Sequence, residues 1–513
     1  MSNGIRPVTR VARGATYVFV QSILSNLLGT IYLVVLLWAI PPPPEHPDMG
    51  IYAILTIIQT LIAVFGAFAL GTASTKYIAQ YVAEGQPEKA RSVVTRVLQI
   101  DLVTSGVLTL VLFLLSGFFS VMLNVPTWAS LFQILALSSF LTVLRPHIAG
   151  FLQGLQKIRE VAFLNLLYEI VQKSSSIYML YAGLGLFSVV YGWLIGLAAF
   201  SLAGLILTQK FLGIIEKPHP IRPLMGFSSP LYVSNILGFF SGYTDQFLTL
   251  PFLGVAILGF YHVAARAAVI AGLISTSIIT ALFPQLSELH TRGGKDALAR
   301  AFRVSTRSVL VSFPVILGLV AVAKPVFLLV NADYLPAVAP LIVICFSALV
   351  GAVGVAVHPT LLTLERTKTV LGLSVISIMI NTFASYSSLA YLNLGMTGPA
   401  WARIFSTLAS VGLGAYVLKK TLDATFDKEA LWKGLTASVL MVTVVMLVEE
   451  LIFDANMLLY LLLFYIAVGI IVYFVSLIAL KTIKKSDIER VRDYLPGKFK
   501  GLASWLDRFA VPD

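Results

Sequence analysis

Charged residues are scarce in this sequence. Lysine, arginine, aspartate and glutamate make up 12% of its 513 residues, about half of the roughly 25% that is usual in soluble domains. Hydrophobic residues make up 58%, and the mean hydropathy is +0.90. This composition excludes an ordinary soluble globular protein and indicates a polytopic membrane protein.

Cysteine and the common cofactor motifs are also lacking. The single Cys345 excludes an intramolecular disulfide. The sequence has no GxxxxGK[ST] loop, so ATP hydrolysis by this chain is not expected. His147, His262 and His358 are scattered over different apolar segments without metal-ligand spacing. We therefore expect no catalytic residue, no metal and no cofactor, and we interpret each histidine as a packed side chain, with proton relay as the alternative.

Long apolar stretches divide the chain into fourteen expected membrane spans. A helix needs about 20 apolar residues to cross about 30 Å of hydrocarbon, because each residue adds about 1.5 Å. The spans are expected near 15–40, 49–75, 93–119, 129–155, 160–183, 186–210, 224–250, 255–285, 302–330, 336–363, 369–392, 397–419, 430–451 and 456–481. The expected fold class is therefore an all-α polytopic membrane protein.

Basic residues gather in alternate loops. Most of the 36 lysines and arginines, including Lys157 and Arg159, fall on one side if the N-terminus is placed there. Loops on the other side, such as PPPPEHPD and NADYLP, are neutral or acidic. Short cytoplasmic loops are rich in Lys and Arg, so both termini are expected in the cytoplasm and the protein in the cytoplasmic membrane. Attraction to anionic membrane lipids explains the net charge of +12, and no nucleic-acid partner is expected.

Two pairs of loops repeat at the same spacing. LQGLQKIREV (152–161) and LLTLERTKTV (361–370) lie 209 residues apart. At this offset Gly85 in AEGQPEKARSVV matches Gly294 in TRGGKDALARAF. Short basic loops can resemble each other by chance, but two pairs with one offset favour a duplication. Because six spans make one repeat, the halves should be parallel and related by an axis along the membrane normal.

The repeat predicts the domain organisation. We expect an N-terminal lobe of helices 1–6 over residues 1–215 and a C-terminal lobe of helices 7–12 over 216–425. Two further helices follow over 426–483, outside the repeat. In the tail, 484–513, aromatic and leucine residues recur at helical spacing within 499–509 beside basic residues, which is typical of an interfacial amphipathic helix.

Two charges inside the expected spans are the leading site candidates. A charge near the membrane centre costs at least about 2.5–3.5 kcal/mol on insertion scales, so it needs a partner, a cavity or a task. Arg266 lies deep in the span 255–285, and Asp245 lies near the outer end of 224–250. We expect Arg266 to face a polar cavity and Asp245 to be its partner. The alternative is an ion pair that only joins the two helices.

Five other intramembrane charges have simpler explanations. Arg145 fits substrate binding and structure equally well. Glu169 and Lys173 are spaced i, i+4, so they are expected to neutralise each other on one helix face. Arg403 and Lys324 lie in the outer parts of their spans, so interfacial anchoring is expected for both.

Polar residues that suit a sugar chain occur at matching places in the two halves. Lys76, at the cytoplasmic end of the second span, either receives an anionic head group or anchors the topology. Asn26 and Asn235 are candidates for binding a sugar chain through hydrogen bonds, and close packing of helices is the alternative for them. Their polar neighbours are Gln21, Ser22, Ser25, Ser234, Tyr243 and Gln246.

Three stretches resemble a known transporter family. They are GTASTKYIAQYVAEGQPEKARSVV (71–94), DQFLTLPFLGVAILGFYHVAARAAVI (245–270) and LFPQLSELH (282–290). They look like the polysaccharide transporter family, which contains lipid-linked oligosaccharide flippases and belongs to the multidrug/oligosaccharidyl-lipid/polysaccharide exporter superfamily. The resemblance implies two six-helix lobes around a central cavity that opens alternately to either side, with a lipid-linked sugar as cargo.

The expected function is a flippase that moves a polyprenyl-(pyro)phosphate-linked oligosaccharide across the cytoplasmic membrane by alternating access. A pyrophosphate needs positive charge, and arginine suits phosphate geometry, so Arg266 with Asp245 is the expected site. Its partners would be the cargo, membrane lipids and a possible coupling ion, H⁺ or Na⁺. The alternative is a cation- or proton-coupled multidrug antiporter in which Asp245 and Glu169 bind the cation. Short outer loops disfavour a third class, a membrane-embedded glycan polymerase or ligase, so no enzyme is expected.

Overall fold

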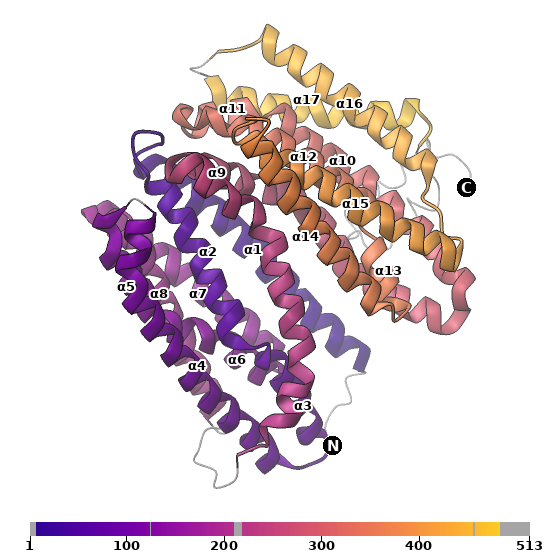
Figure 1. The fold of residues 1–513 in the computed structure, drawn as a ribbon. Coiled ribbons are helices and arrows are strands. Elements are labelled where there is room, and N and C mark those ends of the chain that lie inside the picture. The colour runs from indigo at the N-terminus through magenta and orange to yellow at the C-terminus, as the bar shows by residue number, and fades with distance from the viewer. Residues whose placement is uncertain (1–6, 124, 210–217, 455–456, 483–513) are drawn as a thin grey trace. The chain divides into compact units, whose positions relative to one another are not determined.

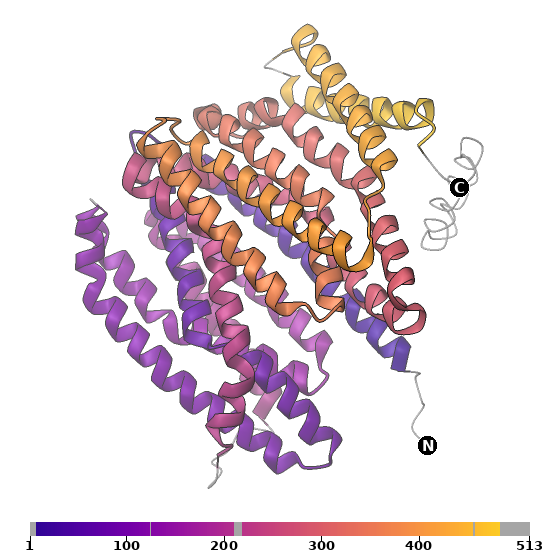
Figure 2. The same ribbon diagram turned by 45° about the vertical axis from the view of Figure 1, so that its right-hand side comes forward.

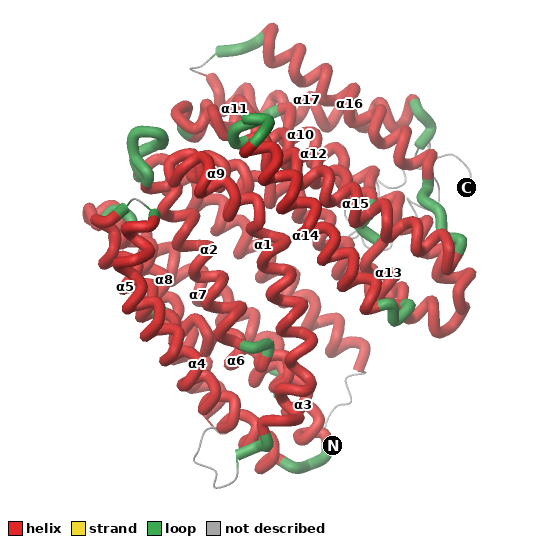
Figure 3. Tube along the Cα trace, viewed as in Figure 1, coloured by secondary structure: helices red, strands yellow, loops and turns green. Residues whose placement is uncertain are grey.

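The computed structural model is built of α-helices joined by short loops. It describes residues 7–123, 125–209, 218–454 and 457–482. Over these ranges no strand is present (Figure 3). The expected all-α class is confirmed, whereas the amphipathic helix expected in the tail lies outside the described residues.

The chain forms two compact units, Met1–Tyr243 and Thr244–Asp513. The division falls inside α9 (Ile221–Ser305). The start of α9 belongs to the first unit because Leu224 is buried in its core and the Tyr232 hydroxyl donates to the Phe65 carbonyl at 3.3 Å. The division of the chain into two six-helix lobes at 215 stays a prediction.

The described residues of the first unit form eight further α-helices. They are α1 (Pro7–Ala39), α2 (Asp48–Ala67), α3 (Leu70–Ala83), α4 (Pro87–Met122), α5 (Ala129–Leu137), α6 (Ser139–Gly154), α7 (Ile158–Met179) and α8 (Phe187–Thr208). Figure 1 shows α4 beside α5, and α4 also packs on α3 and α6. The second expected span is broken into α2 and α3, because Phe68 and Ala69 adopt left-handed φ values of 47° and 54°.

The second unit continues from α9. Its helices are α10 (Val309–Ala321), α11 (Ala323–Val330), α12 (Val338–Val353), α13 (Val357–Thr363), α14 (Thr367–Ala390), α15 (Thr397–Leu422), α16 (Lys428–Leu451) and α17 (Leu458–Ala479). Figures 1 and 2 show α14 beside α15 and α16 beside α17. Near the basic loops, Arg307 pairs with Asp427 at 3.0 Å, and Asp427 also caps the start of α16. This pair joins the α10 and α16 segments.

Twelve stretches of the described chain are helical, long and apolar enough to cross a membrane. One of them, 221–273, contains a bend at Gly254. The 22-residue helix α7, which carries Glu169 and Lys173, is not among them. The polytopic helical fold is confirmed, and the count of fourteen spans stays a prediction.

The repeated loops share their backbone conformation. Gln156 and Glu365, 209 residues apart, have φ values of 60° and 57°. Gly85 and Gly294, at the same offset, have φ values of 70° and 65°. After Gln156 and after Glu365, the next backbone N–H donates to the carbonyl five residues before it, at 2.8 and 3.0 Å. This is the same helix C-terminal cap built twice, and it supports the duplication inferred from the sequence.

Candidate functional site

Asp245 is the centre of a buried polar cluster in the second unit. Its side chain has no exposed surface. The Tyr261 hydroxyl donates to Oδ2 at 2.6 Å, and the Gln246 backbone N–H donates to Oδ1 at 2.9 Å. The Arg403 guanidinium, from α15, lies 2.8 Å from Oδ2. A buried carboxylate is tolerated when it is paired and hydrogen-bonded, so these three donors hold the two arms of α9 to α15.

The bend at Gly254 brings these residues to one level. Gly254 has φ 83°, a conformation that glycine adopts readily and that other residues rarely do. Asp245 lies nine residues before the bend and Tyr261 seven residues after it. With a rise of about 1.5 Å per residue, the two positions lie at similar distances from the bend on antiparallel arms.

The expected pair between Asp245 and Arg266 was wrong, since Arg403 is the basic partner of Asp245. Arg266 lies five residues beyond Tyr261 on the second arm, which displaces it by about 7 Å along the helix. The expectation that Arg403 is an interfacial anchor was wrong for the same reason: its guanidinium reaches the carboxylate and is only 24% exposed. The position of Arg403 along its span did not reveal that its side chain points toward Asp245.

Arg266 is exposed, and a short chain of hydrogen bonds orients it. Its Nε–H donates to His262 Nε2 at 3.4 Å, and His262 Nδ1 lies 2.9 Å from Gln246 Oε1. An amide oxygen only accepts, so Nδ1 carries the proton and Nε2 offers its lone pair to Arg266. His262 is therefore a neutral, fully packed link, as expected for a packed histidine. The arrangement anchors one nitrogen of Arg266 and leaves its terminal amino groups for an external anion.

Arg145 has partners inside the first unit. Its guanidinium carbon lies 3.9 Å from the centroid of the Tyr168 ring, and its Nη2 donates to Asn165 Oδ1 at 3.2 Å. Both partners are on α7, whereas Arg145 is on α6. A cation over an aromatic face is stabilised by the ring quadrupole. These contacts support the structural alternative for Arg145.

Lys76 is exposed in the middle of α3. Its ammonium lies 4.1 Å from the centroid of the Phe227 ring and 5.2 Å from that of Tyr77. The same part of the unit holds His219, whose carbonyl accepts from Arg96 Nε at 2.7 Å. The two rings partly stabilise the positive charge of Lys76. Whether Lys76 binds a head group or anchors the topology stays open.

The remaining candidates are placed as follows. Asn26 is partly exposed and donates its amide to the Ser22 carbonyl of its own helix at 2.8 Å, and Asn235 is exposed on α9. Their sugar-binding roles stay predictions. Glu169 and Lys173 form the expected i, i+4 ion pair on α7, so that prediction is confirmed.

Asp101 was not among the residues predicted from the sequence. This residue of α4 is 1% exposed, and its Oδ1 lies 3.6 Å from Nδ1 of His147, which is fully buried in α6. A signal was present in the sequence, because Asp101 is an acidic residue inside the expected span 93–119. Ionisable residues at membrane depth mark functional sites by default.

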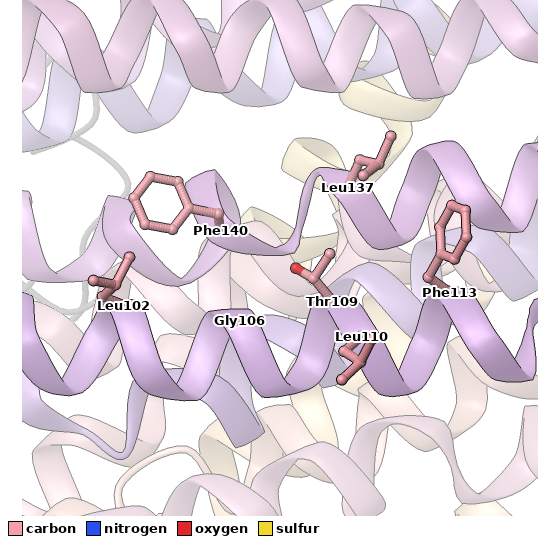
Figure 4. A pocket seen from close by; sticks show the side chains of 7 residues that line it. All are labelled: Leu102, Gly106, Thr109, Leu110, Phe113, Leu137 and Phe140. Carbon is pink, nitrogen blue, oxygen red and sulfur yellow. The ribbon is translucent and has the colours of Figure 1, made fainter.

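An apolar groove lies on the first unit between α4 and the α5–α6 segment, with a volume of about 390 Å³. Its lining residues, shown in Figure 4, are Leu102, Gly106, Thr109, Leu110, Phe113, Leu137 and Phe140. Thr109 supplies the polar side-chain atom among them. A phosphate-bearing head group needs charged or strongly donating partners, so this groove fits a hydrocarbon chain and not the head group.

An all-helical membrane fold with a duplicated loop structure and ionisable side chains inside its helices is the architecture of a transporter. The sequence profile of the family described as "Polysaccharide biosynthesis protein" matches residues 45–339. This match covers more than half of the chain, and the protein belongs to that family.

Known relatives and solved structures agree with this assignment. The probable low-salt glycan biosynthesis flippase Agl15 of Haloferax volcanii is 23% identical over 390 residues, which are 74% of this chain and 78% of Agl15. The lipid II flippase MurJ in an inward closed conformation matches with a TM-score of 0.72 at 16% identity, covering 89% of this chain and 97% of that one.

A multidrug resistance MATE family transporter of the MOP superfamily, in an inward-facing conformation, also shares the fold. It matches with a TM-score of 0.66 at 12% identity, covering 77% of this chain and 96% of that one. The resemblance stated from the sequence is thereby confirmed for the family, and the solved structures show the shared fold.

Proposed function

We propose that this protein is a flippase that moves a polyprenyl-(pyro)phosphate-linked oligosaccharide across the membrane by alternating access. Its family, the flippase Agl15 among its relatives and the flippase MurJ among its structural neighbours support this function. The observation that carries the proposal is the exposed Arg266 guanidinium, held by a neutral histidine inside a membrane-spanning helix.

Arg266 would bind the phosphate part of the cargo. A guanidinium presents donors in a planar fork that matches phosphate oxygens, and charge-assisted hydrogen bonds are strong away from water. Because His262 fixes Nε, less side-chain entropy is lost when the terminal amino groups bind an anion. Asn26 and Asn235 would contact the sugar chain, while the polyprenyl tail stays in the hydrocarbon.

The Asp245–Arg403 pair has a consequence for this role. A carboxylate paired with Arg266 would compete with the phosphate for its donors. Arg403 neutralises Asp245 in a separate pair, and Arg266 keeps its affinity for anions. The pair therefore supports binding by keeping Asp245 away from the site cation.

The antiporter alternative has less support from the same contacts. It needs a carboxylate that is available to a mobile cation. Asp245 is already paired with Arg403, and Glu169 with Lys173. Fixed cations in both places weaken any binding of a transported one.

The orientation in the membrane is also part of the proposal. We place the basic loops and both termini in the cytoplasm. Cys345 is buried, so thiol labelling of the parent should give little background. A membrane-impermeant maleimide added to intact cells should label Asp333→Cys and leave Glu88→Cys unlabelled until the cells are permeabilised. The reverse pattern would invert the topology.

Leaflet exchange of a fluorescent lipid-linked oligosaccharide in proteoliposomes tests the site. Removing a hydrogen bond to a charged group costs about 1.5–3 kcal/mol, so Arg266→Ala should slow exchange by roughly 10- to 100-fold. Arg266→Lys should keep part of the rate, because it keeps the charge but loses the fork. Arg303→Ala, which removes an exposed arginine from the last turn of α9, is the matched control and should exchange like the parent. Parent-like exchange in Arg266→Ala would remove Arg266 from the site.

A further inference from the structure

Asp101 and His147 form an incompletely bonded polar pair in the core of the first unit. Asp101 is 1% exposed and His147 is fully buried. Neither carboxylate oxygen of Asp101 has a hydrogen-bond partner in the described part of the chain, and neither does Nδ1 of His147. The closest approach of the pair is 3.6 Å, between Nδ1 and Oδ1. Buried polar atoms in folded proteins are almost always bonded, so these three atoms need an explanation.

The second ring nitrogen of His147, Nε2, shows that a proton is missing between His147 and Asp101. His147 Nε2 lies 3.1 Å from the Ala67 carbonyl oxygen, which only accepts, so Nε2 carries a proton. With a neutral ring, Nδ1 then turns a lone pair toward the lone pairs of the Asp101 carboxylate. One added proton removes this conflict, because an imidazolium with a carboxylate and an imidazole with a carboxylic acid both have zero net charge. Either form places a hydrogen between His147 Nδ1 and Asp101 Oδ1, which lie 3.6 Å apart.

No fixed cation in the described chain replaces that proton. Arg96 on α4 donates to the His219 carbonyl, Lys76 on α3 lies over Phe227, and Arg145 on α6 lies over Tyr168.

Helix α7, which packs on α6, carries Arg159, which is exposed in its first turn, and Lys173, which pairs with Glu169. Helices α2, α5 and α8 contain no lysine, arginine or histidine. The titratable side chains of α2 and α8 are Asp48, Tyr52 and Tyr191. Tyr52 lies 15 residues, about 22 Å of helix, before Ala67. Tyr191 lies 13 residues before Gly204, the residue of α8 that packs on Ile148. Asp101 therefore depends on His147 for its neutralisation.

The pair also lies at a break in the helix path. The Ala67 carbonyl is available to His147 because α2 ends there and Phe68 and Ala69 are left-handed. Next to the break, α3 and α6 touch backbone to backbone: a Cβ added to Gly71 would lie 2.4 Å from the Pro146 carbonyl oxygen. A change in the angle between α2 and α3 must alter the bond from His147. The charge of the pair and the bend are thus physically linked.

We propose that Asp101 and His147 form a proton-binding site that takes up and releases one proton during the transport cycle and couples it to the α2–α3 bend. The transport part of this inference rests on the proposed function. Proton binding itself does not, because it concerns only the pair and the helices around it. The site holds the proton in the conformation described here and releases it when the bend opens the pair to water.

Two measurements on the full-length protein test the proposal. The first is hydrogen exchange, followed by mass spectrometry, of peptides spanning 62–74 in nanodiscs at mildly acidic and mildly alkaline pH, corrected for the intrinsic pH dependence of exchange. The parent and Asp333→Asn, a loop carboxylate control, should show a pH-dependent change in protection at the break. Asp101→Asn, which keeps the shape and cannot titrate, should show none, and His147→Gln should lose most of it. A change that persists in Asp101→Asn would overturn the site.

The second measurement is leaflet exchange of the fluorescent cargo in vesicles with and without a pH difference. The parent and Asp333→Asn should exchange at a rate that depends on the pH difference, and Asp101→Asn should exchange at one rate under both conditions. If the parent exchanges cargo at the same rate with and without the pH difference, the proposed coupling is overturned and the flippase function is not. If the parent moves no cargo, the proposed function fails, and the hydrogen-exchange result still decides whether the proton site exists.

Discussion

Arg403→Ala tests whether the buried Asp245 pair holds the second unit together. The substitution removes the charged partner of a carboxylate that has no exposed surface, and leaves it with the Tyr261 hydroxyl and one backbone N–H. Breaking a buried pair from one side costs about 3–5 kcal/mol, because the remaining charge is uncompensated. Asp245→Asn should cost less, about 1–3 kcal/mol, because Arg403 is 24% exposed and can turn toward polar surroundings.

The assay is reversible unfolding in mixed micelles by increasing the fraction of a denaturing detergent. The double variant Asp245→Asn with Arg403→Ala completes a cycle, and it should be more stable than the sum of the single effects predicts, with a coupling of about 1–3 kcal/mol. Glu88→Gln is the matched control, since it breaks an exposed i, i+3 pair with Arg91 and should cost no more than about 0.5–1 kcal/mol. Equal unfolding midpoints for Arg403→Ala and Glu88→Gln would refute the pair and the account of the bend built on it.

Two further changes test the backbone features. Gly71→Ala should destabilise the first unit by about 1–3 kcal/mol through overpacking against the Pro146 carbonyl, whereas Gly117→Ala, which meets nothing within 4 Å, should be neutral or slightly stabilising in the same unfolding assay. Equal effects would contradict the close approach. Glu365→Gly should raise stability by roughly 0.5–1 kcal/mol, because a non-glycine residue with φ 57° carries the steric cost of the left-handed region; an unfolding midpoint below the parent's would contradict that conformation.

The fold was largely predictable because hydrophobic length and loop charge are local properties of the sequence. The offset of 209 residues even located the two loops whose backbones match at Gln156 and Glu365. The break of the second span at Phe68 and Ala69 was not predictable, since neither residue has an intrinsic preference for φ > 0. It depends on the close packing of α3 on α6.

The site was predictable in part, because the residue types that matter are rare in membrane spans. Arg266 and Asp245 were found because a charged side chain inside the hydrocarbon is unfavourable in free energy. The buried cluster around Asp245 confirms that its carboxylate needs hydrogen-bond donors and a positive partner. The partner of Asp245 was predicted wrongly. Two spans that follow each other in the sequence pack side by side, but this does not fix which of their residues lie at the same height along the helices. Counting residues from Gly254 would have pointed to 261–263 and away from Arg266. Asp101 was not predicted, because acidic residues inside the spans were considered only as partners of basic ones.

The most direct test of the central claim is whether the purified protein moves lipid-linked oligosaccharide between leaflets. Vesicles carry a fluorescent polyprenyl-pyrophosphate oligosaccharide in both leaflets, and a membrane-impermeant quencher is added outside without ATP. We expect the parent protein to make the inner-leaflet cargo accessible to the quencher faster than in protein-free vesicles. Quenching that stops at the outer leaflet with and without the protein, together with uptake of an organic cation by the same vesicles, would contradict it.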